Sequence, residues 1–507
     1  MSSDPEVVVI GAGPNGLAAA CVLARAGLSV LVVEAHPERA GGALASDAGT
    51  LPGFTHDVGA AFFPFAQASP AFRDLRLDEH GLRWTFAPIE SAHPAPDGSV
   101  AVLARDLDIV ERNFGSPEDG ARMRRVCEWH RKVEPSLIPA MLETFPAIRP
   151  ALGLLPFAII RIAATFMRSG ARLSNAWFRS EAARRVIPGL ALHTDVGPDD
   201  TFGSGIGYML AVMATTGGYG VPEGGAGAIT AALLGKLESH GGRLQLGARV
   251  ESIVVRDNRA VAVVLADGQE IRASTGILSD TSAPALLGRL VDAKHLPGRI
   301  VRKMASFASG WGTFKIDWAL DGPVPWSCEP AREAAVVHAG DSLEDLRRFT
   351  NEVRGGALPS NPYLVIGQQS LSDPTRAPAQ QHTLWAYSRV PNHAPGAGDW
   401  AELKARFADT VDARIEALAP GFRDRVLARR AVSPDDLEHM DANLIGGDLG
   451  GGSNAWYRQL LFRPVFPWFR YRMPVRGLYL GSSYAHPGAG VHGMCGYNAA
   501  QMLLRDL

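Results

Sequence analysis

The chain has 507 residues, of which 50 are Lys or Arg and 52 are Asp or Glu, and its formal net charge is −2. A hydrophobic fraction of 46% and a charged fraction of 20% are ordinary for a globular protein, which excludes a largely disordered chain. The balanced charge argues against a nucleic-acid partner, because such proteins carry a clustered basic excess. At roughly 150 residues a domain, the length predicts two or three structural lobes.

The cysteines and the N-terminus indicate a reducing compartment. The 4 cysteines are far apart and form no C-x-x-C pair, and no H-E-x-x-H is present, so we expect neither disulfides nor a metal site. Residues 1–6 lack the charged region and the cleavage site of a signal peptide. We therefore expect a cytoplasmic protein, and the sequence leaves peripheral membrane contact open.

The chain begins with the pattern of a strand, a glycine-rich turn, a helix and a second strand. Val7–Ile10 is a β-branched run suited to a buried parallel strand. Gly11 permits the tight turn, Gly13 lets the backbone approach a pyrophosphate, and Gly16 lets the helix pack closely on the strand. The helix N-terminus offers N–H groups to the phosphates. Glu34 follows the second strand, where a carboxylate accepts ribose hydrogen bonds and disfavours NADP.

This fingerprint leaves FAD and NAD open, and two further segments favour FAD. Arg39 with Gly41, Gly42 and Ala43 combines a cation with close backbone approach, which suits a second contact on the diphosphate. Residues 477–493 read as a strand and a glycine-dense loop before a terminal helix. The N-terminus of that helix can stabilise the negative charge that a flavin gains at N1–C2=O on reduction.

Candidate residues fall in these segments. The predicted cofactor-binding residues are Gly11, Gly13, Pro14, Asn15, Gly16, Glu34, Ala35, Arg39, Gly41, Gly42, Ala43, Gly481, Ser482, Gly488, Gly490 and Val491. Dehydrogenation also needs a group that receives a proton, and histidine titrates near neutrality. The candidate catalytic residues are His486, His492, Tyr484 and His56. Hydrogen bonding to backbone or flavin is the alternative for the histidines, and core packing is the alternative for the tyrosine.

At these residues the chain resembles the phytoene desaturase and carotenoid desaturase-like FAD-dependent oxidoreductases. These belong to the wider amine oxidase-like superfamily, and the pyridine-nucleotide-disulphide oxidoreductase domain 2-like branch is the most similar. The matching stretches are GAGPNGLAAACVLARAGLSVLVVEA, ERAGGA, LPGFTHDVGAAFFP, VPEGGAGAITAALL with GGRLQLGARVESIVV, and GLYLGSSYAHPGAGVHGMCGYNAA. The resemblance implies FAD in an extended conformation with Val250 near the adenine. It also implies hydride transfer from a hydrophobic substrate to flavin N5.

The pattern along the chain predicts an α/β fold with a Rossmann-type FAD-binding domain and a discontiguous α+β substrate domain. The ranges expected for the FAD-binding domain are 1–70, 222–290 and 471–507. The ranges expected for the substrate domain are 71–221 and 291–470. A helix is predicted over 399–418, where apolar residues recur at helical spacing.

Residues 151–167 form the longest apolar run outside the nucleotide unit, and arginines follow them. The run contains Pro156 and Arg161, so it is a poor transmembrane helix. A core helix lining a substrate tunnel is the favoured interpretation, and a membrane interface or a dimer interface is the alternative. The expected partners are thus a small hydrophobic substrate, a membrane surface or a second copy, and no nucleic acid.

We expect an FAD-dependent oxidoreductase that desaturates a carotenoid-like or isoprenoid-like substrate. A flavin amine oxidase acting on a soluble amine is the second interpretation, and an aromatic cage with a lysine near the flavin would support it. A non-catalytic escort protein on the same fold is the third. The glycine-rich flavin segments argue against the third, because a protein without flavin has no need of them.

Overall fold

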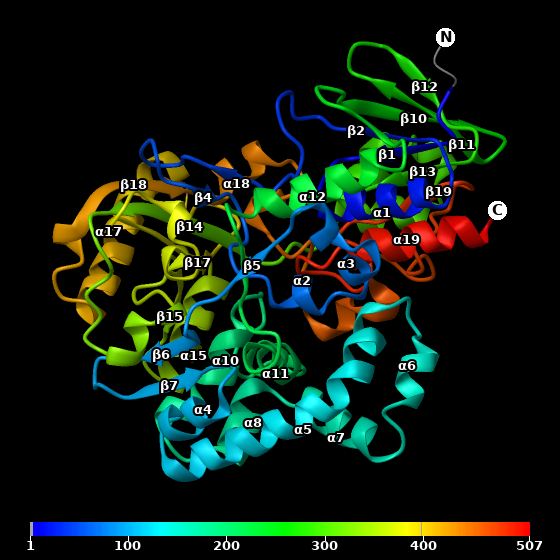
Figure 1. The fold of residues 1–507 in the computed structure, drawn as a ribbon. Helices are drawn as coiled ribbons and strands as arrows, with labels where there is room; N and C mark the ends of the chain where they lie inside the picture. Colours follow the sequence, from blue (N-terminus) through cyan, green and yellow to red (C-terminus); the bar gives the residue numbers. More distant parts are fainter. Residues whose placement is uncertain (1–3, 397) are drawn as a thin grey trace.

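The computed structural model describes residues 4–396 and 398–507, and it has the predicted α/β fold (Figure 1). Residues 1–3 and 397 fall inside the predicted ranges 1–70 and 291–470 and lie outside the described residues. Two large sheets organise the molecule. One lies near both chain ends, and the other lies on the opposite side, with a helical region below them in Figure 1.

The first sheet has five parallel strands in the order β19-β13-β1-β2-β9. The strands are β1 (Val7–Ile10), β2 (Val30–Val33), β9 (Arg243–Gln245), β13 (Gly276–Ser279) and β19 (Leu478–Leu480). In the central register Val9 pairs with Leu278 and Val32. Each of the three ranges expected for the FAD-binding domain therefore supplies at least one strand, and the domain boundaries themselves stay a prediction.

Three helices and a meander complete this half of the molecule. Helix α1 (Pro14–Arg25) packs against both α12 (Gly227–Glu238) and α19 (Met494–Arg505). The meander consists of β10 (Val250–Arg256), β11 (Arg259–Leu265) and β12 (Glu270–Arg272). Helix α1 begins at Pro14, because proline is favourable at a first helical position. Helix α19 begins at Met494, directly after the left-handed Gly493.

The second sheet has seven strands in the order β18-β14-β17-β16-β15-β6-β7, and only the β15–β6 pair is parallel. The strands are β6 (Ile89–Pro94), β7 (Val100–Leu103), β14 (Gly312–Leu320), β15 (Ala334–Ala339), β16 (Leu364–Gly367), β17 (His382–Val390) and β18 (Val426–Val432). The predicted helix near 399–418 is α17 (Trp400–Leu418). It packs on this sheet and buries Trp400 and Phe407.

Helices fill the space below the two sheets in Figure 1. They are α4 (Leu107–Asn113), α5 (Pro117–Leu142), α6 (Ile148–Leu152), α7 (Phe157–Phe166), α8 (Gly170–Trp177), α9 (Glu181–Arg184), α10 (Val186–Ala191) and α11 (Gly203–Ala214). The remaining α-helices are α2 (Pro64–Ala68), α3 (Pro70–Leu75), α13 (Ala283–Ala285), α14 (Gly298–Ala305), α15 (Leu343–Arg354), α16 (Gln369–Ser372) and α18 (Pro434–Met440). The short strand pairs are β3 (Ser46–Asp47) with β4 (His56–Asp57), and β5 (Trp84–Thr85) with β8 (Val221–Pro222). Within the described residues, no helix is long and apolar enough to cross a membrane.

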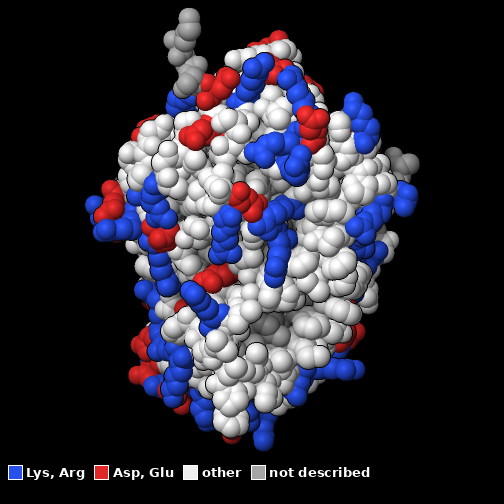
Figure 2. Space-filling view, turned by 90° about the vertical axis from the view of Figure 1, so that its right-hand side faces the viewer, with Lys and Arg blue, Asp and Glu red and all other residues white. Residues whose placement is uncertain are grey.

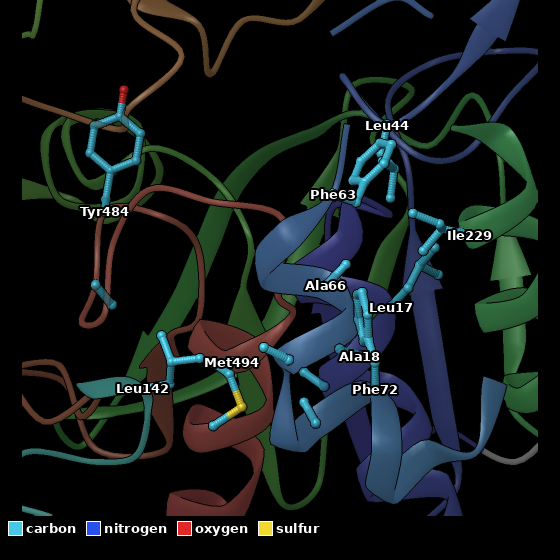
Figure 3. Close-up of a cluster of buried hydrophobic side chains, with 14 of the residues drawn as sticks. Leu17, Ala18, Leu44, Phe63, Ala66, Phe72, Leu142, Ile229, Tyr484 and Met494 are labelled. Carbon is cyan, nitrogen blue, oxygen red and sulfur yellow. The ribbon is translucent and has the colours of Figure 1, made fainter. Parts of the chain in front are cut away.

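A buried apolar cluster fixes α1 against the rest of the molecule. Figure 3 shows Leu17 and Ala18 of α1 beside Ala66 of α2 and Phe72 of α3, with Met494 of α19 close by. All of these side chains are buried. The cluster therefore holds the N-terminal end of α1 in a defined place, which matters because the glycine fingerprint lies there.

Candidate active site

A single cavity of about 1630 Å³ extends from the glycine fingerprint to the seven-stranded sheet. It is lined at one end by Gly11, Gly13 and Glu34, and at the other by Trp385 and Tyr387 of β17. Ligand pockets commonly measure about 300–1,000 Å³. The cavity is therefore large enough for a dinucleotide and for a second molecule beside it.

The fingerprint glycines leave no room for a side chain. A Cβ on Gly13 would lie 2.6 Å from Oδ2 of Asp280, and a Cβ on Gly16 would collide with the carbonyl oxygen of Gly11. Gly11 itself has a φ of +95°, which disfavours any residue with a side chain. The turn thus brings bare backbone to the cavity at the start of α1, as pyrophosphate binding requires.

Glu34 is held by the backbone at the end of β2. Its carboxylate accepts hydrogen bonds from the N–H of Ala12 at 2.7 Å and of His36 at 2.8 Å. The N–H of Ala248 donates to the Glu34 carbonyl at 2.7 Å, which places the segment leading to Val250 beside it. Glu34 and Val250 both line the cavity, in the arrangement expected for a ribose and an adenine.

Asp280 is a site residue that the sequence reasoning missed. It follows β13, lines the cavity, and accepts a hydrogen bond from the Gly16 N–H at 2.7 Å. Burial raises the pKa of Asp280 well above its ordinary value, and the nearby carboxyl groups of Asp441 and Glu34 add to the effect, while the Gly16 N–H opposes it. A carboxyl group at the carboxyl end of a parallel strand beside β1 was the available signal.

The C-terminal loop closes the same end of the cavity. Helix α19 packs so tightly on the start of α1 that a Cβ on Gly496 would collide with the carbonyl oxygen of Asn15. The Asn15 side chain lines the cavity, and its buried Oδ1 has no hydrogen-bond partner among the described residues. The N-terminus of α1 and the Arg39 cation therefore line the cavity as donors suited to a diphosphate, and the Asn15 amide oxygen adds an unpaired acceptor; these groups fit FAD.

The structure brings most of the predicted site residues together. Those that line the cavity are Gly11, Gly13, Pro14, Asn15, Glu34, Ala35, Arg39, Gly42, Ala43, Val250, Ser482, Tyr484, Gly490 and Val491. Those outside its lining are Gly16, Gly41, Gly481, Gly488, His56, His486 and His492. The glycines of the second group are packing positions. A Cβ on Gly41, for example, would lie 2.7 Å from Oγ1 of Thr230.

The three predicted histidines are buried behind the cavity wall. The ring of His486 lies 3.1 Å from the Glu143 carbonyl oxygen, and Nδ1 of His492 accepts the Met494 N–H at the start of α19. His56 lies 2.8 Å from the Thr50 hydroxyl and 3.8 Å from Asp317. Burial lowers the pKa of each of these imidazoles to about 4. Through these contacts the three histidines position the surrounding backbone and side chains. A direct role of the three histidines in proton transfer stays a prediction.

The far end of the cavity is apolar and aromatic. Its walls include Phe62, Phe63, Met209, Leu210, Tyr219, Val336, Val365, Trp385 and Tyr387. Trp385 and Tyr387 meet edge to face with ring centroids 5.1 Å apart. Arg389, on the same strand, lines the cavity and forms no ion pair within the described residues; its buried Nε has no hydrogen-bond partner there. This half of the cavity suits an apolar molecule with at most one polar end.

A chain of hydrogen-bonding groups leads from this wall into the interior, and the sequence reasoning missed it. The Tyr387 hydroxyl lies 3.0 Å from Nδ1 of His193, and Nε2 of His193 lies 2.9 Å from Nε2 of His338. The Ser91 hydroxyl then lies 2.9 Å from both Nδ1 of His338 and Nε2 of His93. The four residues that join His193 in this chain come from three different strands, so no local pattern announces it.

The chain allows a consistent donor order. Burial lowers the pKa of His93 and His193 to about 3 and that of His338 well below its ordinary value, so the three rings are neutral near pH 7. A neutral imidazole donates through one nitrogen and accepts through the other. If the Tyr387 hydroxyl donates to His193, every later group can donate onward as far as His93. The opposite order of donors and acceptors is equally complete, so protons can be relayed along the chain in either direction.

The comparisons with known proteins decide the family. The model of the flavin containing amine oxidoreductase family matches residues 15–310, which include the fingerprint helix, β13 and Asp280. The chain belongs to this family. It is an FAD-dependent oxidoreductase of the desaturase-like branch, as the sequence predicted, and its cofactor is FAD. The escort interpretation is therefore wrong.

Several curated relatives match this oxidoreductase over nearly its whole length. Pyridine nucleotide-disulfide oxidoreductase domain-containing protein 2 of Rattus norvegicus is 28% identical, with 99% of this chain and 94% of the relative covered. The phytoene desaturase (lycopene-forming) of Pseudescherichia vulneris is 26% identical, with 99% of both chains covered. A limonene dehydrogenase component of Castellaniella defragrans is 24% identical, with 99% of this chain and 95% of the relative covered.

Solved structures share the fold. An oxidoreductase from Methanosarcina mazei aligns with a TM-score of 0.66 at 16% identity, over 98% of this chain and 99% of the other. A putrescine oxidase bound to putrescine aligns with a TM-score of 0.61 at 18% identity, over 99% of this chain and 98% of the other. At such identities the likeness concerns the fold alone.

Proposed function

We propose that this flavoprotein dehydrogenates a hydrophobic substrate of the isoprenoid or carotenoid class. The observation that carries the proposal is the single cavity that joins the cofactor-binding fingerprint to an apolar, aromatic wall. A long hydrocarbon gains about 25 cal/mol for each Å² of apolar surface that it removes from water in such a space. The names of curated relatives that act on phytoene, hydroxyneurosporene and limonene support the same substrate class.

Desaturation removes a hydride and a proton from neighbouring carbon atoms. Bound FAD supplies the hydride acceptor. The oxygen of Tyr387 is the first group of the buried chain, and it can take up a proton while its own proton moves to Nδ1 of His193. The displacement then passes through His338 and Ser91 to His93. His193 and His338 each receive one proton and release another, so both stay neutral, and one proton is left on Nε2 of His93, the last group of the chain.

Arg389 can orient the substrate. Its guanidinium donates to the Thr313 hydroxyl at 2.6 Å and to the His193 carbonyl, and it lies 5.3 Å from the centroid of the Tyr387 ring. A buried cation without a carboxylate partner favours an oxygen-bearing group on a ligand. We therefore expect a substrate with a polar oxygen at one end to bind better than the corresponding pure hydrocarbon.

An amine substrate is the alternative, and the Trp385–Tyr387 pair is the observation that favours it. Two aromatic rings at the cavity wall can flank a cationic or neutral amine. An amine oxidase mechanism also needs a lysine near the flavin, and Lys315 does not meet this need. Nζ of Lys315 lies 2.5 Å from both carboxylate oxygens of Asp317, and Lys315 is not part of the main cavity lining. The apolar substrate is thus the better match.

Anaerobic reduction of the bound flavin tests the proposal. The purified protein is mixed without oxygen with a micellar polyene or isoprenoid alcohol, with its hydrocarbon counterpart, and with a diamine such as putrescine. We expect bleaching of the visible flavin band by the isoprenoids, faster with the alcohol, and a product that has lost two hydrogen atoms. Bleaching by the diamine alone would establish the amine alternative and overturn the proposal.

A further inference from the structure

The exposed large hydrophobic side chains gather on two segments of the chain. The first segment, residues 148–167, exposes Ile148, Leu152, Leu155, Phe157, Ile159, Ile160 and Met167; the second, residues 456–466, exposes Trp456, Tyr457, Leu460, Leu461, Phe462 and Phe466. Elsewhere in the described chain only Leu427 and Leu507 are comparable. Phe157 is 82% exposed, so the favoured interpretation of 151–167 as a core helix is wrong for most of its length. A concentration of this kind marks an interaction site rather than chance exposure.

The two segments form one surface around the mouth of the cavity. Phe202, beside α7, stacks on Trp456 with ring centroids 5.9 Å apart, and Nε of Arg470 donates to the Phe145 carbonyl at 3.1 Å. Phe166, Phe202, Trp456 and Leu460 all line the cavity. Figure 2 views this side of the molecule, and its lower half is largely uncharged around a hollow, with Lys and Arg and some Asp and Glu at the edges. We call residues 148–167 and 456–466 together the apolar surface.

The stretches of chain that carry the apolar surface are basic. Residues 144–180 contain five arginines and no Asp or Glu, and residues 449–505 contain six arginines and no Asp or Glu, although the whole chain has a net charge of −2. Arg149, Arg168 and Arg172 are exposed and form no ion pair within the described residues. Arg161 lies over the Trp129 ring at 4.0 Å, which leaves its charge at the edge of the surface. A second copy of this surface would bring like charges together, which disfavours a homodimer here.

We propose that the apolar surface docks on an anionic lipid bilayer. Apolar side chains that reach the acyl boundary, with unpaired arginines at the headgroup level, are the two features that bind a helix in the interface plane. Helix α7 has 10 residues and spans about 15 Å, so it lies in the interface and does not cross it. The cavity then opens directly onto the lipid. If the proposed function holds, a lipophilic substrate passes from the bilayer into the cavity without crossing water.

Vesicle co-sedimentation of the intact FAD-loaded protein tests the proposal. We expect binding to vesicles of phosphatidylcholine with phosphatidylglycerol, weaker binding to phosphatidylcholine alone, and loss of the difference at high salt. The variant Phe157→Ser/Ile160→Ser should lower the vesicle affinity at least about tenfold, since two exposed side chains lose their burial in lipid. Leu427→Ser/Leu507→Ser removes two exposed apolar residues elsewhere and should bind as wild type.

Two double variants that remove arginines measure the electrostatic contribution to vesicle binding. Arg149→Gln/Arg172→Gln should lower the affinity for anionic vesicles several-fold, whereas Arg83→Gln/Arg256→Gln, exposed elsewhere, should not. Sedimentation velocity is run on the same proteins without lipid. No binding to any vesicle, or a wild-type dimer that the Phe157→Ser/Ile160→Ser variant converts to a monomer, would overturn the proposal and assign the surface to a second copy. Vesicle binding does not depend on the reaction, so its outcome is separate from that of the flavin-reduction test.

Discussion

Gly16 gives a direct test of how the fingerprint positions the cofactor. A Cβ at this position would collide with the Gly11 carbonyl oxygen and would lie 3.0 Å from both Cβ and Oδ2 of Asp280. Because a backbone oxygen cannot turn away as a side chain can, α1 must move off β1. Overpacking of this kind costs about 1–3 kcal/mol, and alanine returns about 1 kcal/mol of helix propensity. For Gly16→Ala these two terms leave a net loss of about 1 kcal/mol, and at most about 2 kcal/mol.

The matched control lies in another helix of the same half of the molecule. Gly235 in α12 is also an interior helical glycine, but its Cβ would meet only the His80 side chain, at 3.4 Å. Gly235→Ala should therefore be neutral or more stable by about 0.5–1 kcal/mol. Urea denaturation measures both variants, and the absorbance ratio of flavin to protein measures the FAD that each retains after dialysis. If Gly16→Ala keeps wild-type stability and FAD content, the close approach of α1 to β1 does not position the cofactor.

Three further predictions concern the buried polar groups. Tyr387→Phe should slow anaerobic flavin reduction by about 10²–10⁴-fold, since it removes the first proton acceptor, whereas Tyr219→Phe, whose hydroxyl donates to a backbone carbonyl, should change it little; equal effects would contradict the proton path. Burial raises the folded-state pKa of Asp280 above 3.8, so folding binds a proton and stability falls as pH rises past about 4. Denaturant unfolding from pH 4.5 to 8 measures this. The difference in free energy of unfolding between Asp280→Asn and wild type should shift in favour of the variant by about 1.4 kcal/mol per pH unit, as long as the pH lies between the unfolded and folded pKa values of Asp280. A difference that stays constant with pH would refute the prediction. Burial lowers the pKa of His486 from 6.5 to about 4, so the unfolded chain binds the proton first and the free energy of unfolding falls as pH drops between these values. His486→Gln should reduce the slope of that fall by about 1.4 kcal/mol per pH unit, and the exposed control His439→Gln should leave the slope unchanged. Equal slopes for wild type and His486→Gln would argue for a charged His486.

The cofactor half of the site could be predicted because its signals are local. The spacing of Gly11, Gly13 and Gly16 between a β-branched strand and an alanine-rich helix fixes a turn that one stretch of chain completes by itself. Glu34 follows at the end of the next strand for the same reason. These local signals, together with the Arg39 and C-terminal glycine segments, predicted the class of fold and the cofactor, whereas Asp280, which accepts the Gly16 N–H, joins the turn only in the folded chain.

The substrate half could not be predicted because its parts are distant in sequence. Ser91, His193, His338 and Tyr387 become neighbours only when β6, β15 and β17 join one sheet beside α10. The buried positions of His486 and His492 likewise depend on how the C-terminal loop folds back on α5 and α19.

Exposure was also decided by packing. The run 151–167 has the composition of a core helix, yet α7 buries only Ile162 and Thr165, and of its other apolar residues only Phe166 lines the cavity. A hydrophobic pattern predicts which residues are favourable to bury, but it does not predict which surface buries them. The sequence by itself therefore determined an FAD-binding oxidoreductase. Only the tertiary structure decided where its apolar cavity opens, which groups can move a proton there, and which apolar side chains remain for a lipid surface to cover.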